Sequence, residues 1–508
     1  MFFSILPCEL QLTIFEILCA TTVRLPRGTG ANHLVHPSSA YASVNTTWQR
    51  FFEKHNFKHI ILQQYDIDDF RTVVHDKGHR RRLVEWIWLR LELPQYGCHL
   101  CEEPESDKEE LQNNIIFTDM VWTLFDLLAT WRKMSGFRVD KGTLTLELSA
   151  HSPSDSQHWW KELQGRINDT PWKAHSLPRS RISDRAHGWR KGRQLLAPGR
   201  GAIMRAHGHP QGLQFDHNAP SARQMRKLPK VSVVGRLVIR RQFYRNISVP
   251  WALKPIIESL THLTDLRYET WRGIDSEVAP GRAIRDAQRI QLFRDVFKYR
   301  RSLRRVSIFE DFDSIVYPAD VSIQPVDPEL GQALAKASRG FEEVHAALNI
   351  DAADFFSPIL DHRPRGGVEW LRLKHLSLTS LEMGPIGYRL LIHRAAEAAK
   401  VMPVLELMEL WNGQQEWAGI FRFQVEGDQA MIQLLTTFTA NFLPVTSRIW
   451  REVAAERGCR HELKMRLGTL DATVDDFVSV LPLLKFKKRI LMDTSLHQLL
   501  TFWGIKDA

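Results

Sequence analysis

Cys98 and Cys101 form the one cysteine pair whose spacing is typical of a metal or redox site. Two cysteines separated by two residues can chelate zinc, but a zinc ion needs four ligands. The other cysteines lie far away and singly, and His99, between the pair, is a poor fourth ligand on geometric grounds. A redox pair would open a helix, whereas acidic residues follow this pair and would raise the pKa of its thiols. We therefore expect a plain loop here, with no metal ion and no cofactor.

A second set of reactive residue types is His151, Ser152 and Asp155, which together contain the groups of a hydrolase triad. Neighbours in sequence rarely converge on one point, and the chain has no Gly-x-Ser-x-Gly motif. Gly28 and Gly30 lie in a loop with no strand before them, so they fail the dinucleotide-binding context. The sequence therefore predicts no catalytic residues. A hydrolase with its site on the strand-end loops is the alternative, and it would bring His151, Asp155 and another acid into one deep pocket.

Composition and charge favour a folded chain that acts inside the cell. Of the 508 residues, 44% are hydrophobic and 25% are charged, which is ordinary for globular domains. The net charge of +10 is mild for this length and lacks the concentrated basic blocks of a nucleic-acid binder, so we expect no nucleic-acid partner. Five sparse cysteines favour a reducing compartment. No stretch approaches the about 20 apolar residues of a membrane span, so we expect the cytoplasm, the nucleus or both.

The middle of the chain alternates short strand-like segments with helical ones. Several share one sequence frame: an apolar residue, two polar residues, and then two apolar residues separated by one position. Leu303, Val306 and Ile308 are an example. The last four segments recur at roughly 30 to 40 residues, a period typical of arrays whose stacked units share one core. A doubly wound α/β sheet is the alternative. The strand-like segments are 57–62, 84–93, 143–149, 235–240, 263–268, 303–309, 344–350, 373–378 and 405–411.

Two further segments interrupt or close this array. Residues 179–230 are rich in Arg, His, Gly and Pro and poor in aliphatic residues, which predicts a disordered insertion. Residues 421–432 predict a hairpin that turns at Gly427 and Asp428. The final stretch, 445–508, has a mainly helical pattern, and we expect it to cap the array.

Tryptophan is frequent, with 16 residues in the chain. Core filling is the simplest role for most of them. Some follow strand ends or lie in loops, where aromatic side chains commonly anchor a partner. These residues form the candidate recognition surface: Trp159, Trp160, Trp189, Trp271 and Trp411.

The N-terminal region combines two short amphipathic helices. Apolar residues recur at helical spacing between residues 6 and 18, and a second helix is expected over residues 39–54. Two helices this short cannot bury all of their apolar residues against each other, so some must meet a partner.

This region resembles an F-box. The pattern is Leu6-Pro7-x-Glu9-Leu10, Ile14, Ile17-Leu18, Ala42-Ser43-Val44 and Trp48-Gln49-Arg50-Phe51-Phe52. A long loop at 21–39, and Asn45 where cysteine is common, depart from the family pattern. The resemblance implies docking onto the Skp adaptor of a cullin–RING ubiquitin ligase. The apolar residues that would contact the adaptor are Leu6, Pro7, Leu10, Ile14, Ile17, Leu18, Val44, Trp48 and Phe51.

Further stretches are similar to a large group of filamentous-fungal F-box proteins of unassigned substrate. They are residues 84–89, 146–156, 268–272, 308–312 and 402–413.

We therefore expect an α/β chain with an N-terminal helical F-box over residues 1–54. An irregular leucine-rich-repeat-like strand–helix array would follow over 55–413, and a hairpin with a helical cap over 414–508. The resemblance implies a non-catalytic receptor that presents a protein substrate for ubiquitination. Apart from the hydrolase, the alternative is a repeat scaffold whose box no longer binds the adaptor.

Overall fold

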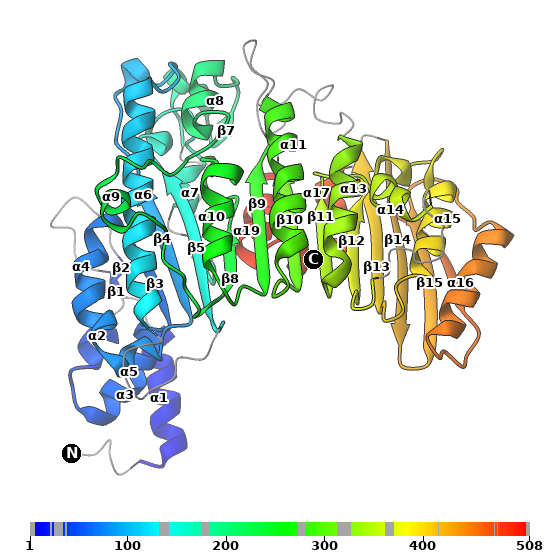
Figure 1. The fold of residues 1–508 in the computed structure, drawn as a ribbon, viewed down its shortest axis with the longest axis horizontal. Helices are drawn as coiled ribbons and strands as arrows, with labels where there is room; N and C mark the ends of the chain where they lie inside the picture. Colours follow the sequence, from blue (N-terminus) through cyan, green and yellow to red (C-terminus); the bar gives the residue numbers. More distant parts are fainter. Residues whose placement is uncertain are drawn as a thin grey trace.

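The centre of the molecule is one twelve-stranded sheet (Figure 1). The structure is a computed structural model that describes residues 6–20, 23–24, 34–35, 38–131, 142–167, 169–173, 182–272, 281–311, 327–360, 370–414, 416–471, 473–474 and 476–503. From one edge to the other the strands are β3 (His59–Leu62), β4 (Trp86–Glu92), β5 (Leu144–His151), β8 (Val234–Ile239), β9 (Asp265–Trp271), β10 (Arg305–Asp311), β11 (Glu343–Ala347), β12 (His375–Thr379), β13 (Leu407–Gln414), β14 (Trp417–Glu426), β15 (Gln429–Thr436) and β16 (Lys464–Thr469).

The strands of this sheet from β3 to β13 all run parallel, and each pairs with the next strand of the sheet along the chain. Every strand-like segment expected from the sequence is a strand of this sheet. Among the described strands the order follows the chain without the reversal that defines a doubly wound sheet, so that alternative is wrong.

From β9 to β13 a constant register places the apolar positions of the sequence frame in shared rows. Leu266, Val306, Val344, Leu376 and Met408 are successive cross-strand partners, and all are buried. Partners in this row are roughly 30 to 40 residues apart along the chain, the period of a repeat array. The frame therefore marks the side chains that build one continuous core.

Helices cover one face of the sheet, the front face in Figure 1. Their apolar residues share the main core with the strand rows. No helix in the described part of the chain is both long and apolar enough to cross a membrane. The helices on this face are α6 (Asp107–Thr130), α10 (Lys254–Ser259), α11 (Gly281–Gln291), α13 (Pro328–Ala337), α14 (Ala352–Leu360), α15 (Tyr388–Ala399) and α16 (Pro444–Glu456).

The C-terminal segment crosses the opposite face of the sheet. It consists of α17 (Phe477–Val480), a 3-10 turn (Leu481–Leu483), α18 (Lys487–Ile490) and α19 (Asp493–Trp503), which lie behind the strands in Figure 1. Its apolar residues form a second core with Phe309, Trp411 and Ile420. We expected residues 445–508 to cap the end of the array. Instead β16 extends the sheet, and the residues after it return across the strands.

Buried carboxylates on the strands hold the backbone of this C-terminal segment. The Glu409 side chain accepts hydrogen bonds from the backbone amides of Lys485 and Phe486, each at 3.0 Å. Glu269 accepts one from the amide of Met492 at 2.7 Å and another from the hydroxyl of Ser495. Both carboxylates are almost fully buried, so these contacts satisfy groups that would otherwise be costly to bury.

The C-terminal part of the sheet contains the expected hairpin. Strands β14 and β15 are antiparallel, and Glu426 pairs with Gln429 across the turn at Gly427 and Asp428. Gly427 has a φ of 62°, the left-handed conformation that glycine adopts at little cost.

The expectation of disorder over residues 179–230 is wrong for residues 182–230, which are folded. They contain β6 (Trp189–Arg190), β7 (Arg193–Gln194), α8 (Arg200–His207) and α9 (Pro220–Met225). Aromatic residues and buried arginine supply the packing that aliphatic residues provide elsewhere. Arg205, for example, is buried and contacts the Glu109 carboxylate at 3.0 Å.

Removing the Glu409 side chain should weaken the whole fold. Glu409→Ala leaves the buried Arg422 guanidinium without its 2.8 Å carboxylate partner and leaves two backbone amides unsatisfied. We expect the free energy of unfolding in urea to fall by about 3 kcal/mol, as is usual when one partner of a buried ion pair is removed.

Glu426→Ala is the matched control, because the Glu426 side chain is 75% exposed at 3.8 Å from Lys485. It should change the stability by no more than about 0.5 kcal/mol. Equal denaturation midpoints for the two variants would contradict a role for Glu409 in holding the C-terminal segment.

Candidate functional site

An aromatic cluster joins the N-terminal helices α1 (Cys8–Ala20) and α3 (Thr46–Asn56). Phe15 is buried at its centre, and its ring centroid lies 5.0 Å from that of Trp48, 4.7 Å from Phe51 and 5.4 Å from Phe52. Phe15, which was not singled out from the sequence, packs the two helices together. Trp48 and Phe51 are half-buried, so each contributes both to this packing and to the surface.

Apolar side chains lie exposed on the outer side of this cluster. Leu10 is 50% exposed, Ile17 is 61% exposed and Val44 is 57% exposed, while Ile14 is half-buried. Leu10, Ile14 and Ile17 are spaced so that they share one face of a helix. Of the other expected contact residues, Leu6 and Leu18 are half-buried and Pro7 is exposed. The described structure thus presents an apolar surface, which is the kind of surface that binds a partner.

The single helix expected over residues 39–54 is instead two helices, α2 (Ser38–Tyr41) and α3. Asn45 explains the break, because it adopts an extended conformation and caps α3. Its side-chain oxygen accepts hydrogen bonds from the amides of Thr47 at 2.9 Å and Trp48 at 3.0 Å. Asparagine is among the best residues for this position, so the departure from the family pattern at Asn45 has a local structural reason.

Helix α3 is attached directly to the body of the molecule. Glu53 near its end is mostly buried and forms an ion pair at 2.6 Å with Arg80, whose guanidinium also lies 4.9 Å from the ring centroid of Phe57. Strand β3 begins at His59, only three residues after the helix ends. The N-terminal region is therefore joined to the edge of the sheet without a flexible linker.

The five tryptophans expected to form a recognition surface are buried. Their indole N–H groups explain part of this placement: Trp189 donates to the Trp159 carbonyl at 2.8 Å, and Trp271 donates to the Arg241 carbonyl at 2.8 Å. Trp160 packs on the Tyr244 ring at a centroid distance of 4.4 Å. Trp411 is fully buried under the C-terminal segment. As a recognition surface this expectation is wrong, and core filling describes these residues.

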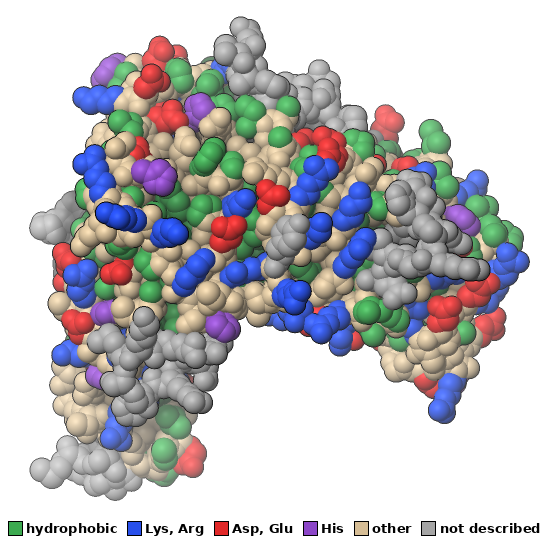
Figure 2. Space-filling view, in the orientation of Figure 1, with side chains coloured by type: hydrophobic (Ala, Val, Ile, Leu, Met, Phe, Trp, Pro, Cys, Tyr) green, Lys and Arg blue, Asp and Glu red, His purple; other side chains and the backbone are tan. Residues whose placement is uncertain are grey.

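A groove of about 810 Å³ on the helix-covered side contains a tryptophan that is exposed. Trp251 is 60% exposed there, and Phe215 and Leu228 supply further apolar surface. Lys227 and Lys230 add positive charge to the lining. Figure 2 shows Lys and Arg side chains spread along this face of the molecule, as a mild net charge predicts. The groove has the chemistry to hold an apolar segment that carries acidic groups.

The residues of the hydrolase alternative do not form a catalytic arrangement. His151 is buried and stacks on the Phe243 ring at a centroid distance of 4.1 Å. Asp155 instead accepts hydrogen bonds from the Tyr96 hydroxyl at 2.8 Å and from the backbone amide of Ser152 at 3.1 Å. Burial lowers the pKa of His151 to about 3 and raises that of Asp155 to about 6. Asp155 thus organises the turn after β5.

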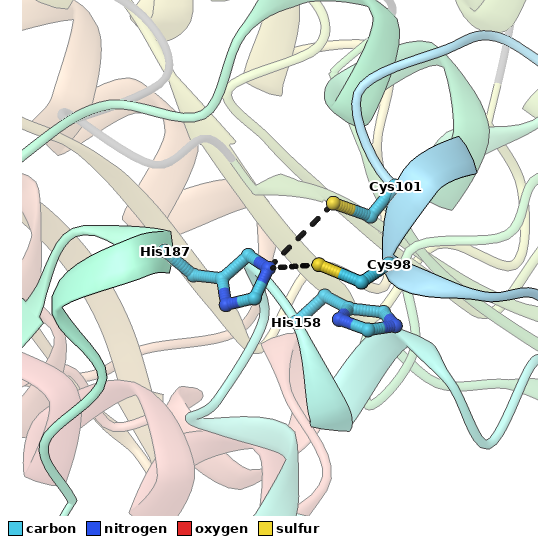
Figure 3. A group of neighbouring side chains, drawn as sticks. All are labelled: Cys98, Cys101, His158 and His187. Atoms are coloured by element: carbon cyan, nitrogen blue, oxygen red, sulfur yellow. Dashed lines mark hydrogen bonds between the residues drawn. The ribbon is translucent and has the colours of Figure 1, made fainter.

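Two histidines lie beside the cysteine pair, as Figure 3 shows. The donor atoms of Cys98, Cys101, His158 and His187 all lie within 4.8 Å of one another. The Nε2 atom of His187 is 3.5 Å from the Cys98 sulfur and 3.6 Å from the Cys101 sulfur. These four residues could hold a metal ion, and three separate segments of the chain supply them.

The cysteine pair is otherwise poorly suited to redox chemistry. Burial is the main factor that raises the pKa of the Cys101 thiol to about 11, and Cys98 and then Glu102 add to the shift. The sequence-based expectation that neighbouring acids raise this pKa is confirmed in direction, with burial as the larger cause. Without a bound cation, Cys101 is a protonated thiol and a weak nucleophile.

Sequence reasoning missed His158 and His187 because it considered only the cysteines and His99 as ligands. One signal was present. Cys98 follows β4 and His158 follows β5, and the carboxyl ends of neighbouring parallel strands meet at one edge of a sheet. His187 gave no such signal, because it lies within the segment that was expected to be disordered.

Comparison with known proteins leaves the function open. Residues 298–492 match the family model described as "Family of unknown function (DUF6546)", which covers less than half of the chain. No curated protein and no solved structure matches the chain. The matched segment runs from the turn before β10 to the residue before α19, so it includes the first part of the C-terminal segment. Both the N-terminal apolar surface and the Cys-His cluster lie outside it.

The cap at Asn45 provides a test of the N-terminal structure. Asn45→Ala removes the acceptor of two amide hydrogen bonds, which costs about 1 kcal/mol at a helix N-terminus. We expect hydrogen–deuterium exchange in residues 46–56 to become about 5-fold faster. Asn45→Asp keeps an acceptor and should exchange at the original rate, and equally fast exchange in both variants would contradict the capping role.

Proposed function

We propose that this chain is an F-box substrate receptor that docks on the Skp adaptor of a cullin–RING ubiquitin ligase. The observation that carries the proposal is the apolar surface formed by Leu10, Ile14 and Ile17 on α1 and by Val44 in the turn before α3, with α1 and α3 packed together through Phe15. These positions are also those at which the sequence resembles the family. An exposed apolar surface on a small helical unit gains free energy when a partner covers it. The receptor would act in the cytoplasm, the nucleus or both.

The strand–helix body would be a leucine-rich-repeat-like array. Three features support this: consecutive strands pair in chain order, they keep one register, and helices lie on one face. Each unit buries its apolar face only by stacking on the next. The C-terminal segment is an addition to this plan, because it covers the strand face that such arrays use for binding.

The array would hold the protein substrate, and the partner subunits would carry out ubiquitin transfer. With the strand face covered, the groove around Trp251 is the candidate for the contact with substrate. Its exposed indole and its lysines Lys227 and Lys230 suit a segment with apolar and acidic side chains.

Adaptor capture tests the proposal directly. Purified full-length protein is titrated with a purified Skp adaptor by calorimetry. The double variant Leu10→Glu/Val44→Glu places two charges in the proposed contact, at side chains exposed enough to change without disturbing the core. Losing two apolar contacts of about 1.5 kcal/mol or more each should weaken binding at least 100-fold.

Ile386→Glu is the matched control, because Ile386 is an apolar residue with 99% exposure in the loop before α15. This variant should bind the adaptor as tightly as the unaltered chain. The proposal fails if the unaltered chain does not bind, in which case it is a repeat scaffold, or if the double variant binds as tightly as the control.

A further inference from the structure

We propose that Cys98, Cys101, His158 and His187 bind one Zn²⁺ ion that fastens a folded insertion to the carboxyl ends of β4 and β5. This site is independent of the proposed adaptor docking. The proposal rests on four observations: the kinds of donor atoms present, the distances between them, the groups that orient them, and the meeting of three separate chain segments at the site.

The donor set is the one that zinc prefers. Two thiolates and two imidazoles form a frequent structural zinc site, and two cysteines separated by two residues are the usual chelating pair. Oxygen ligands, which Mg²⁺ and Ca²⁺ require, are absent from the four-residue cluster itself. Four protein ligands complete a tetrahedral shell and leave no position for substrate, so the ion would have a structural role.

The distances from His187 to the two sulfurs fit a single ion. Zinc–sulfur bonds of about 2.3 Å and zinc–nitrogen bonds of about 2.0–2.1 Å in a tetrahedron place neighbouring ligand atoms about 3.3–3.8 Å apart. The 3.5 Å and 3.6 Å distances from His187 to the two sulfurs fall in this range. In a two-iron cluster with the same residue types, the cysteines bind one iron and the histidines bind the other. The contact of one histidine with both sulfurs instead indicates a mononuclear site.

His187 is oriented as a metal ligand usually is. Its Nδ1 atom lies 2.7 Å from the Asp184 carboxylate, which leaves Nε2 facing the sulfurs. Lys161 in turn holds Asp184 at 2.8 Å. A carboxylate behind a histidine fixes the ring and its tautomer for metal binding. Gly188 allows the chain to turn directly after His187, because its φ is 72° and a Cβ atom there would lie 2.8 Å from that of Leu196.

His158 provides an independent observation. His158 is 9% exposed, and neither of its ring nitrogens makes a hydrogen bond of ordinary length and angle within the described part of the chain. The backbone of Tyr96 is a polar neighbour of the ring. A buried imidazole without such bonds costs free energy, which a bond to a metal ion at one nitrogen would recover.

The fold gives this ion a purpose. Cys98 and Cys101 lie in the turn after β4, His158 lies in the turn after β5, and His187 lies in the insertion just before β6. The local core is small and built around Trp159, Trp160 and Tyr244. One ion bound by all three segments would cross-link them where the local core is small. Because the site exists only in the folded state, the free energy of metal binding would add to the stability of the fold.

Metal analysis of the full-length protein is the test. The chain is produced in zinc-supplemented medium, purified with a thiol reductant, and assayed by mass spectrometry for metals. We expect about one zinc per chain, falling to background in Cys98→Ser/Cys101→Ser. Cys459→Ser removes a cysteine outside the cluster and should retain the full zinc content. Replacement by Co²⁺ should produce the absorption bands of a tetrahedral site with thiolate ligands.

Asp184→Asn keeps the test decisive if the double cysteine variant does not fold. It leaves all four ligands in place and alters only the group that orients His187, so the zinc affinity measured against a chromophoric chelator should fall 10- to 100-fold. Chelation of the unaltered chain should also speed proteolysis within residues 182–207. Zinc no higher in the unaltered chain than in the double cysteine variant, or an unchanged affinity in Asp184→Asn together with no tetrahedral Co²⁺ spectrum, would overturn the proposal.

Discussion

The parallel pairing of consecutive strands, from β3 to β13, is the constraint on which the rest of the structure depends. Parallel strands need a crossover after each strand, and here those crossovers place helices on one face of the sheet. The other face is covered here as well, as is usual for an extended parallel sheet. In this chain the covering comes from the residues after β5 and from the C-terminal segment, which meet where Gln498 donates to the Asp169 carboxylate at 2.8 Å.

That second face is held together by charge as much as by apolar packing. Arg241 pairs with Asp311 in the interior, and Glu409 pairs with Arg422. Such pairs are expensive to bury, and they contribute chiefly when every polar atom finds a partner. The backbone amides of the C-terminal segment complete the shells of Glu409 and Glu269. These hydrogen bonds fix the position of the C-terminal segment on the sheet. Apolar packing alone is non-directional and would define that position less closely.

The sequence was sufficient for the features that depend on local pattern. The apolar frame at Val306 and Ile308 located the strands, and Gly427 located the hairpin, since period and turn chemistry are local properties. Features that depend on distant partners were missed. From the sequence alone, Arg205 looks like a solvent-exposed charge, because nothing shows that the distant Glu109 pairs with it. Residues of this kind led to the expectation that the insertion is disordered. The sequence pattern places Trp271 just after a strand, where it was expected to be exposed. In the structure it is buried in a cluster that includes residues of the insertion, whose folding the local pattern did not predict. His187 and Cys98 are likewise brought together only by the fold.

The attachment of the N-terminal helices determines what a partner bound there could do. Glu53 and Arg80 fix α3 to the body, and β3 follows within three residues, so the apolar surface and the sheet move together. Strand β3 is also one edge of the sheet, and edges that short seldom recruit further strands. An adaptor docked at Leu10 and Val44 would consequently stand in a fixed orientation to the groove around Trp251. Under the proposed function, ubiquitin transfer to a substrate held in that groove would then depend on where the substrate lysine lies relative to the docked ligase.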